Sequence, residues 1–314
     1  MTSLERGSPP RRVALKVDCD TAEGTREGVP RLLDLFGRKS VRATFFFTFG
    51  PDRSGLAVRR IFTRKGFLRK MVRSRGLSLY GWRTALSGTL LPAPRIGERC
   101  EAEIRSVAGA GDETGVHGWD HVRWQDGLDR MSDAEIREHS ERAHAEYVRI
   151  FGAPARASAA PGWAVNARSL AIQEERSLLY ASDTRGGGPF FPSAGGQVLK
   201  TLEIPTTLPT LDETLAWPSL RSEEDLAGFY RAAPRATEVH TIHAEVEGRS
   251  KLDLFSRILD DWIEAGVAFP LLSEIAREAR AGEAPPVRPL ARTRLAGRGG
   301  EVATGWSAGE AAAC

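Results

Sequence analysis

Short apolar runs recur along the chain, separated by segments with helical spacing. The first run, residues 13–17, leads directly into Asp18-Cys19-Asp20, so we interpret it as a buried strand with polar residues at its carboxyl end. The run at 41–49 combines β-branched and aromatic residues and predicts a second strand. Later runs predict strands at 113–116, 156–159, 178–182, 198–204, 239–242 and 267–269.

Three longer segments between these runs have the spacing of helices. Residues 28–36 carry Pro30 early, where a helix tolerates proline. Ser132 opens a second helix with a capping-box sequence, and Gly152 can end it. A third helix is expected at 252–265. Alternating strands and helices predict an α/β fold with a mainly parallel sheet or barrel, in which chemistry gathers at the carboxyl ends of the strands.

Composition divides the chain into three parts. Residues 1–10 are a polar leader, and residues 11–281 are long enough for one domain with a large core. Beyond 281, Ala, Gly, Arg, Pro and Glu dominate, and we expect 282–314 to be a loosely ordered tail. We expect neither a secretory signal nor a membrane-spanning helix, because the first residues are polar and no run of about 18 apolar residues occurs.

Cysteine content and net charge narrow the classes of protein further. Cys19, Cys100 and Cys314 are widely spaced, which argues against a disulfide framework or a thiolate zinc site and favours a reducing compartment. The net charge is only +3, so the chain as a whole has no strong attraction to polyanions.

Two acids and two histidines follow predicted strands. Asp18 and Asp20 are two residues apart, so their carboxylates share one side of the strand and repel each other unless a cation or proton lies between them. His117 and His121 are four apart, a spacing at which both imidazoles can share one metal ion. Asp20, His117 and His121 then form a ligand set for Zn, Mn, Co or Fe with open coordination positions. Asp18 beside it can take a proton from water, as amide hydrolysis requires.

Other polar residues also follow predicted strands. His243 comes after 239–242 and suits a general acid that protonates a leaving amine; a core or surface histidine is the alternative. Asp183 and Arg185 could hold the catalytic base through charge-assisted hydrogen bonds, or form a surface ion pair worth about 0–1 kcal/mol. Trp163 either forms a pocket wall or belongs to the core.

The order of these motifs resembles the polysaccharide deacetylase family over about residues 13–278. The resemblance rests on the strand that ends in Asp-x-Asp, the Ala-Thr-Phe-Phe-Phe strand, His-x-x-x-His and the late Ile-His. It implies a distorted (β/α) barrel. Within the family, the chain is similar to the branch of 4-deoxy-4-formamido-L-arabinose-phosphoundecaprenol deformylases. The matching stretches are GTREGVPRLL (24–33), SLYGW (78–82), HGWDHVRWQ (117–125), DTRG (183–186), IPTTLPTLDE (204–213) and TIHAEVEG (241–248).

The resemblance implies a metal-dependent hydrolase that removes formate from a formamido sugar on undecaprenyl phosphate. The product would be the aminoarabinose lipid used to modify lipid A, a change that weakens the binding of polymyxin and other cationic peptides. Carried over by position, Asp18 is the base and His243 the acid. Asp20, His117 and His121 hold a divalent metal (Zn, Mn or Co), and Asp183 and Arg185 support the site.

A basic segment, residues 53–97, contains no Asp or Glu. Arg69 and Lys70 lie beside apolar residues at helical spacing, and Tyr80 and Trp82 follow. Such a segment suits an anionic membrane surface, where each Lys or Arg contributes about 1 kcal/mol. A helix packed on the barrel is the alternative; nucleic-acid binding is disfavoured because no recognised module accompanies the charges. We therefore expect a peripheral enzyme on the cytoplasmic face of the bacterial inner membrane.

Two other functions remain open at the level of sequence. The same metal chemistry could remove acetyl groups from a polysaccharide. A non-catalytic lipid- or nucleic-acid-binding protein could keep the fold without the chemistry, although every position of the motif is filled here. Glu245 is a candidate to meet the amine of the sugar, and a structural role is equally consistent with its sequence context.

Overall fold

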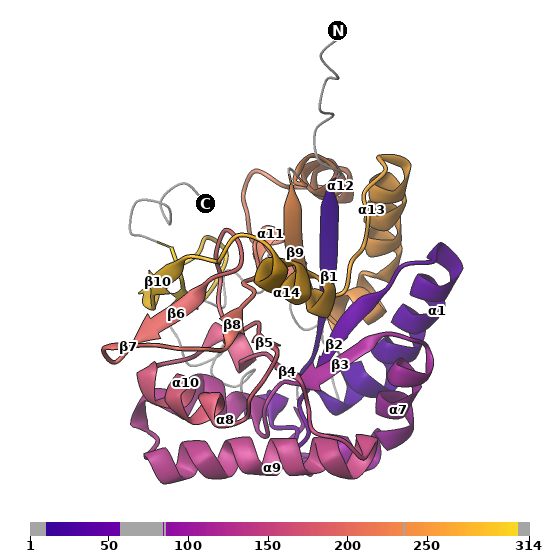
Figure 1. The fold of residues 1–314 in the computed structure, drawn as a ribbon. Coiled ribbons are helices and arrows are strands. Elements are labelled where there is room, and N and C mark those ends of the chain that lie inside the picture. Colours follow the sequence, from indigo (N-terminus) through magenta and orange to yellow (C-terminus); the bar gives the residue numbers. More distant parts are fainter. Residues whose placement is uncertain (1–10, 57–83, 85, 235, 307–314) are drawn as a thin grey trace, which may run out of the picture.

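The computed structural model describes residues 11–56, 84, 86–234 and 236–306. Its centre is a parallel sheet of seven strands in the order β8-β5-β4-β3-β2-β1-β9 (Figure 1). The sheet curls into a half-barrel, and this confirms the predicted fold class. The strands are β1 (Arg12–Cys19), β2 (Ala43–Phe47), β3 (Glu113–Val116), β4 (Ala157–Ser158), β5 (Tyr180–Ala181), β8 (Leu202–Glu203) and β9 (Thr237–His243).

Helices connect these strands and cover the outside of the sheet. In Figure 1, α1, α7 and α13 lie along one side of the sheet and α9 runs across the bottom. The helices of eight or more residues are α1 (Val29–Lys39), α7 (Glu101–Gly109), α9 (Asp133–Phe151), α10 (Ala167–Glu174), α12 (Glu223–Ala232), α13 (Leu252–Glu264) and α14 (Leu272–Ala281). Shorter ones are η1 (Gly24–Gly28), α6 (Ile96–Arg99), α8 (His121–Gly127), η2 (Leu128–Arg130), η3 (Pro161–Trp163), α11 (Leu211–Thr214) and η4 (Val246–Ser250).

The two faces of the sheet meet different surroundings. Alternate residues of β1, Val13, Leu15, Val17 and Cys19, belong to the large apolar core between the sheet and its outer helices. Ala14 points the other way, into a smaller core on the inner face that α14 closes. Lys16 and Asp18 follow Ala14 at the same period of two, so the inner face becomes polar toward the carboxyl end of the strand.

The predicted caps of α9 are present. The Ser132 hydroxyl accepts from the Glu135 N–H, and the Glu135 carboxylate accepts from the Ser132 N–H. Gly152 ends the helix with φ +73°, the left-handed conformation that glycine adopts without cost. The strand expected at 198–204 is wrong in detail, because it is divided between β7 (Gln197–Val198) and β8. The strand expected at 267–269 is reduced to one bridge between Ala268 and Arg12.

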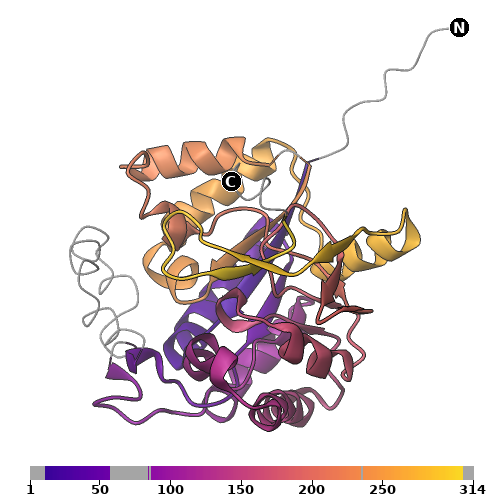
Figure 2. The same cartoon turned by 90° about the vertical axis from the view of Figure 1, so that its left-hand side faces the viewer.

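The expectation of a loosely ordered tail is wrong for residues 282–306. They contain β10 (Val287–Pro289), β11 (Ala291–Thr293) and β12 (Val302–Thr304), and β10 pairs with β6 (Phe191–Ala194). Trp306 and the residues of β12 are buried. In Figure 2 this yellow segment crosses the near side of the molecule. The composition of this segment is polar and rich in glycine, which is typical of a disordered tail. It is ordered by pairing with β6, which lies far away in the sequence.

No helix in the described part of the chain is both long and apolar enough to span a membrane.

Candidate functional site

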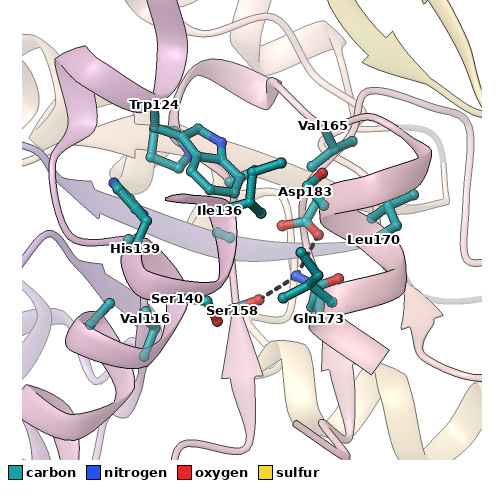
Figure 3. Close-up of a pocket in the computed structure, with 17 residues that line it drawn as sticks. Val116, Trp124, Ile136, His139, Ser140, Ser158, Val165, Leu170, Gln173 and Asp183 are labelled. Carbon is teal, nitrogen blue, oxygen red and sulfur yellow. Dashed lines mark hydrogen bonds between the residues drawn. The ribbon is translucent and has the colours of Figure 1, made fainter. Parts of the chain in front are cut away.

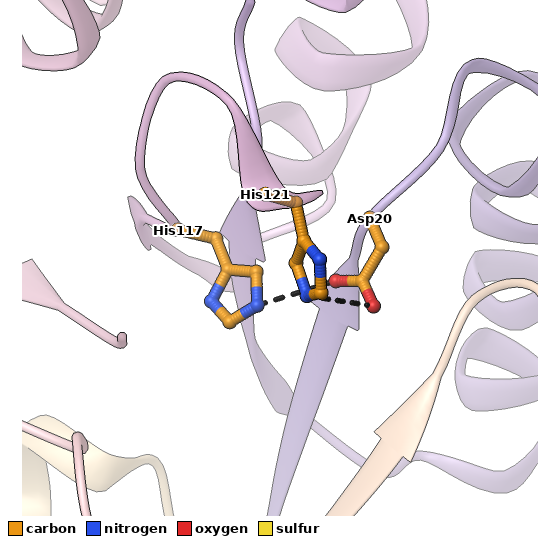
Figure 4. Close-up of side chains that lie close together, drawn as sticks. All are labelled: Asp20, His117 and His121. Atoms are coloured by element: carbon orange, nitrogen blue, oxygen red, sulfur yellow. Dashed lines mark ion pairs between the residues drawn. The ribbon is translucent and has the colours of Figure 1, made fainter. Parts of the chain in front are cut away.

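Asp20, His117 and His121 converge at the carboxyl edge of the sheet (Figure 4). Asp20 follows β1, His117 follows β3, and His121 begins α8. The His117 Nε2 lies 3.2 Å from the Asp20 Oδ1, and the His121 Nε2 lies 3.3 Å from the Asp20 Oδ2. One potential ligand atom from each residue lies within 4.8 Å of the other two. The structure therefore brings together the three predicted ligands.

The hydrogen bonding of His117 shows that this donor set fits a cation. Its Nδ1 lies 2.9 Å from the carbonyl oxygen of Ala159. A carbonyl only accepts, so Nδ1 carries a proton, and in the neutral ring the Nε2 lone pair points toward Asp20. Two acceptors aimed at each other repel unless a positive charge lies between them. Burial lowers the pKa of His121 to about 4, so its ring is neutral near pH 7, as a metal ligand must be.

Buried neighbours hold the ligand-bearing loops in place. The Glu245 Oε1 accepts from the backbone N–H groups of Asp20 (3.0 Å) and Thr21 (2.8 Å) and thereby fixes the end of β1. A Cβ on Gly24 would lie 2.1 Å from that oxygen, so only glycine fits there. The His139 Nε2 accepts from the Asp120 N–H at 2.9 Å, and Asp120 lies between the two histidine ligands in the sequence. These contacts pre-organise the site.

Asp18 lies beside the ligand set, where a base is required. Its Oδ2 is 3.9 Å from the His117 Nε2 and accepts a hydrogen bond from the Lys16 Nζ at 3.1 Å. Its Oδ1 is buried and has no hydrogen-bond partner among the described residues. The carboxylate thus has one engaged oxygen and one free oxygen.

His243 stands next to Asp18 on the neighbouring strand, since the two are register partners in the β1–β9 pair. Its Nδ1 lies 3.7 Å from the Asp212 Oδ1. Burial alone would lower the pKa of His243, but Asp212, Asp20 and Glu247 raise it to about 9. The ring is therefore protonated at neutral pH, which suits a proton donor. The Glu247 Oε2 accepts from the His243 N–H at 2.8 Å and fixes the backbone there.

Asp183 and Arg185 are buried, but they do not pair with each other or contact Asp18 within the described residues. The Gln173 Nε2 donates to the Asp183 Oδ2 at 2.8 Å. The Arg185 Nη1 donates to both carboxylate oxygens of Glu213, at 2.8 and 3.0 Å. The hydrogen bonds from this pair to the base that we considered are not present among the described residues, and burial rules out the alternative of a surface ion pair. Each residue braces a different loop.

Trp163 is 2% exposed, and its ring is surrounded by cations. The guanidinium of Arg298 lies 4.3 Å from the ring centroid, that of Arg185 lies 5.1 Å away, and the Lys16 Nζ lies 5.2 Å away. The Trp163 Nε1 donates to the Thr206 hydroxyl at 3.1 Å. Trp163 is thus a buried ring that contacts Lys16, Arg185 and the segment after α14.

Several predicted residues have other positions. Glu245 is 1% exposed, and its Oε1 holds the end of β1, as in the structural alternative. Arg69, Lys70, Tyr80 and Trp82 lie outside the described residues. Sequence reasoning missed Lys16, Asp212, Glu213 and Arg298. Lys16 could have been found from the sequence, because it is a charged residue inside an apolar run. It lies two residues before Asp18, so the two side chains face the same side of the strand.

A small cavity lies between β3, β4, α9 and α10 (Figure 3). It borders His139, Gln173 and Asp183, and its volume is about 60 Å³. None of the three metal-ligand candidates lines it. The triad itself is reached by solvent, since the side chains of Asp20 and His121 are 20% and 17% exposed.

Comparisons with known proteins agree with this geometry. Residues 5–181 match the family model "Polysaccharide deacetylase". A solved structure from Mycobacterium smegmatis, named as a polysaccharide deacetylase, aligns with a TM-score of 0.62 at 20% identity over 93% of this chain and 98% of its own. One of the same description from Pseudomonas aeruginosa PAO1 gives 0.59 at 18% identity over 88% and 96%. The chain belongs to the polysaccharide deacetylase family and is a hydrolytic, amide-cleaving enzyme.

Two relatives narrow the resemblance, and both carry the name "Probable 4-deoxy-4-formamido-L-arabinose-phosphoundecaprenol deformylase ArnD". The protein of Shewanella sediminis is 37% identical over 265 residues, 84% of this chain and 85% of its own length. That of Wigglesworthia glossinidia brevipalpis is 33% identical over 282 residues, 89% and 97% of the two chains. The predicted similarity to the deformylase branch is confirmed.

Proposed function

We propose that this protein removes the formyl group from 4-deoxy-4-formamido-L-arabinose linked to undecaprenyl phosphate. One observation carries the proposal: the triad of Asp20, His117 and His121 is flanked by Asp18 and His243 on adjacent strands, in a chain 37% identical to a relative of that name. The product would be formate and the free aminoarabinose lipid. That lipid would serve lipid A modification and resistance to polymyxin and other cationic peptides.

A divalent ion held by Asp20, His117 and His121 would supply Lewis-acid chemistry, making a water more acidic and the formyl carbonyl more electrophilic. We propose Zn, Mn or Co. Asp18 accepts the proton of the attacking water on its free Oδ1, while its Oδ2 stays bonded to Lys16. The new bond joins the water oxygen to the formyl carbon.

His243 completes the reaction by donating a proton to the sugar nitrogen as the C–N bond breaks. The bond's electron pair stays on nitrogen, so the products are formate and a primary amine. Asp212 stabilises the protonated ring from 3.7 Å, and Glu247 fixes its backbone. The base and the acid lie on neighbouring strands, so one amide can meet both.

The basic segment 53–97 supports a membrane location for this reaction. Residues 57–83 and 85 lie outside the described part of the chain, but the flanking residues expose apolar side chains: Leu90 is 81% exposed, Leu91 39% and Leu56 36%. Arg53, at the start of the segment, donates to the Asp120 Oδ2 at 2.9 Å, between the two histidine ligands in sequence. We propose that this segment docks on anionic lipid at the cytoplasmic face of the inner membrane.

The decisive experiment combines elemental analysis of the purified enzyme with formate release from the lipid-linked formamido sugar. We expect about one divalent ion per active site and formate release that requires it. The acetamido analogue serves as the competing substrate. Faster acetate release would replace the deformylase proposal with a deacetylase, and metal-free protein with no turnover of either substrate would indicate a non-catalytic binding protein.

Asp18→Asn and His243→Gln test the two proton-transfer roles. Each should lower kcat by about 10²–10⁴-fold, the usual contribution of a positioned acid or base. Asp34→Asn and His144→Gln, on the outer helices α1 and α9, are matched controls that should keep wild-type rates. Rates near wild type in both site variants would refute the assigned roles.

Membrane docking is tested separately by co-sedimentation with vesicles that contain anionic lipid. The double variant Arg69→Gln/Lys70→Gln should bind more weakly, by about 1 kcal/mol for each charge removed, while turnover of a detergent-solubilised substrate stays unchanged. Equal sedimentation of variant and wild type would exclude this segment as the docking surface.

A further inference from the structure

Lys16 is a fully buried lysine on the inner face of β1, with 0% of its surface exposed. Its Nζ donates to the Asp18 Oδ2 at 3.1 Å and lies over the rings of Trp163 and Phe46, at 5.2 and 5.7 Å from their centroids. Within the described residues, this is the one hydrogen bond that Asp18 receives on its side chain. The hydrogen bond of the ammonium group thus goes to the base, and its charge also acts on Asp183.

The positions next to Lys16 on the sheet carry uncharged side chains. They are Thr44 and Thr241 on the neighbouring strands, and Ala14 below Lys16 belongs to an apolar core. A buried ion pair generally contributes little net stability, and apolar residues of similar size are often as stable or better. A lysine here, two residues before the base, therefore calls for an explanation in the chemistry of the site.

The geometry around Asp18 supplies that explanation. Its Oδ2 is only 3.9 Å from the His117 Nε2, so the carboxylate is near enough to turn and join the metal ligands. A carboxylate that ligates the ion no longer takes a proton from water. The bond from Lys16 holds Oδ2 away and leaves Oδ1 free. Asp183 and Arg185 do not do this, since their hydrogen bonds go to Gln173 and Glu213.

We propose that Lys16 is the positioning residue of the catalytic base: it keeps Asp18 outside the metal's ligand set and presents Oδ1 to the attacking water. This inference rests on the proposed amide hydrolysis and assigns a residue that acts through Asp18, without touching the substrate itself.

The test is a double-mutant cycle on the holoenzyme. Lys16→Met should lower kcat by about 10–100-fold, the usual effect of losing a residue that orients a group at a metal site, with little change in KM. Lys16→Arg should restore most of the rate, because it keeps a cation and a donor at this position. In the Asp18→Asn background, Lys16→Met should cause no further loss. Lys39→Met, which removes a lysine paired with Asp260 on the surface, is the matched control.

A second readout does not depend on turnover. Cobalt-loaded Lys16→Met should show an altered visible spectrum, because Asp18 can then enter the ligand set, whereas the double variant Lys16→Met/Asp18→Asn should keep the wild-type spectrum. Wild-type kcat in Lys16→Met, an equal loss in the Asp18→Asn background, or an unchanged cobalt spectrum would each overturn the inference. If wild-type enzyme released no formate, the proposed substrate would fail, and the cobalt spectra would still decide the role of Lys16.

Discussion

The two faces of β1 differ in what surrounds their buried side chains. Leu15 and Val17 on the outer face and Lys16 and Asp18 on the inner face are all buried, with at most 3% of their surfaces exposed. The outer side chains belong to the large apolar core. The inner ones contact each other, aromatic rings and the metal-ligand set.

Equal burial therefore does not imply an equal role. On the outer face, burial stabilises the fold through apolar contact. On the inner face, burial strengthens each charge–charge contact, because little water is present to screen it. Successive side chains of β1 point to opposite faces, so those that stabilise the fold alternate with those that serve the chemistry. Substitutions at adjacent positions should therefore affect either the free energy of unfolding or kcat.

The largest effect is expected at the inner edge of the sheet. His121→Ala removes a ligand from the triad without removing a core residue. Metal affinity should fall by more than about 100-fold, because the loss of a residue that only hydrogen-bonds to a ligand already lowers affinity by up to about 100-fold. Titration with zinc or cobalt measures the loss. Restored activity at high metal concentration would support ligation, and unchanged affinity would remove His121 from the ligand set.

The outer face should show the opposite behaviour. Leu15→Ala deletes a fully buried side chain and should lower the free energy of unfolding by about 2–5 kcal/mol. Because Leu15 faces away from the site, kcat of the remaining folded enzyme should stay at the wild-type value. Urea unfolding and steady-state kinetics together make the comparison, and a large fall in kcat would show that the two faces are not independent.

An intermediate effect is expected at His139, which supports the ligand loop without taking part in the chemistry. Burial lowers the pKa of His139 to about 4, and its neutral Nε2 accepts from Asp120. The unfolded chain binds this proton more readily, so stability from His139 is complete above about pH 6.5 and is lost as pH falls toward 4, by about 1–3 kcal/mol. His139→Gln should flatten the wild-type slope of stability against pH in this window. Parallel slopes in the two proteins would contradict this origin.

The smallest effect is expected at the surface contact of β11. The Arg292 guanidinium donates twice to Asp129, at 2.6 Å, and lowers the pKa of that carboxyl to about 2. The contribution is present above about pH 4 and lost as pH falls through 2. The pair is exposed, so Arg292→Gln should cost no more than about 1 kcal/mol at low salt. Hydrogen exchange of residues 291–304 measures it, and a large change in kcat would be unexpected.

The base and the metal ligands were the easiest residues to predict from sequence, whereas Lys16, on the same strand as the base, was missed. Asp18 and Asp20 follow an apolar run at a spacing of two, and His117 and His121 follow another at a spacing of four. These relations are local, so periodicity alone places each pair on one side. That parallel strands end at the same edge then places the two pairs close together.

The surroundings of the site were harder to predict, because they depend on contacts between distant parts of the chain. Arg185 was identified, but its partner Glu213 is 28 positions away, and Arg298 reaches Trp163 across the whole second half of the domain. The segment after α14 looked like a tail because it is rich in glycine and charge. Its order comes from pairing with β6 and from the bridge between Thr304 and Arg185, which no local pattern indicates.

The segment after α14 is synthesised last, although it covers part of the site. The last ligand, His121, is synthesised 177 residues before Arg298, by subtraction of the two positions. A chain still on the ribosome can therefore contain all three ligands, the base and the acid while Trp163 still lacks its cover. The metal ligands are thus synthesised well before the segment that covers Trp163. Activity should accordingly appear only near the end of translation, and a premature stop after α14 should yield a protein that binds metal but lacks a finished site.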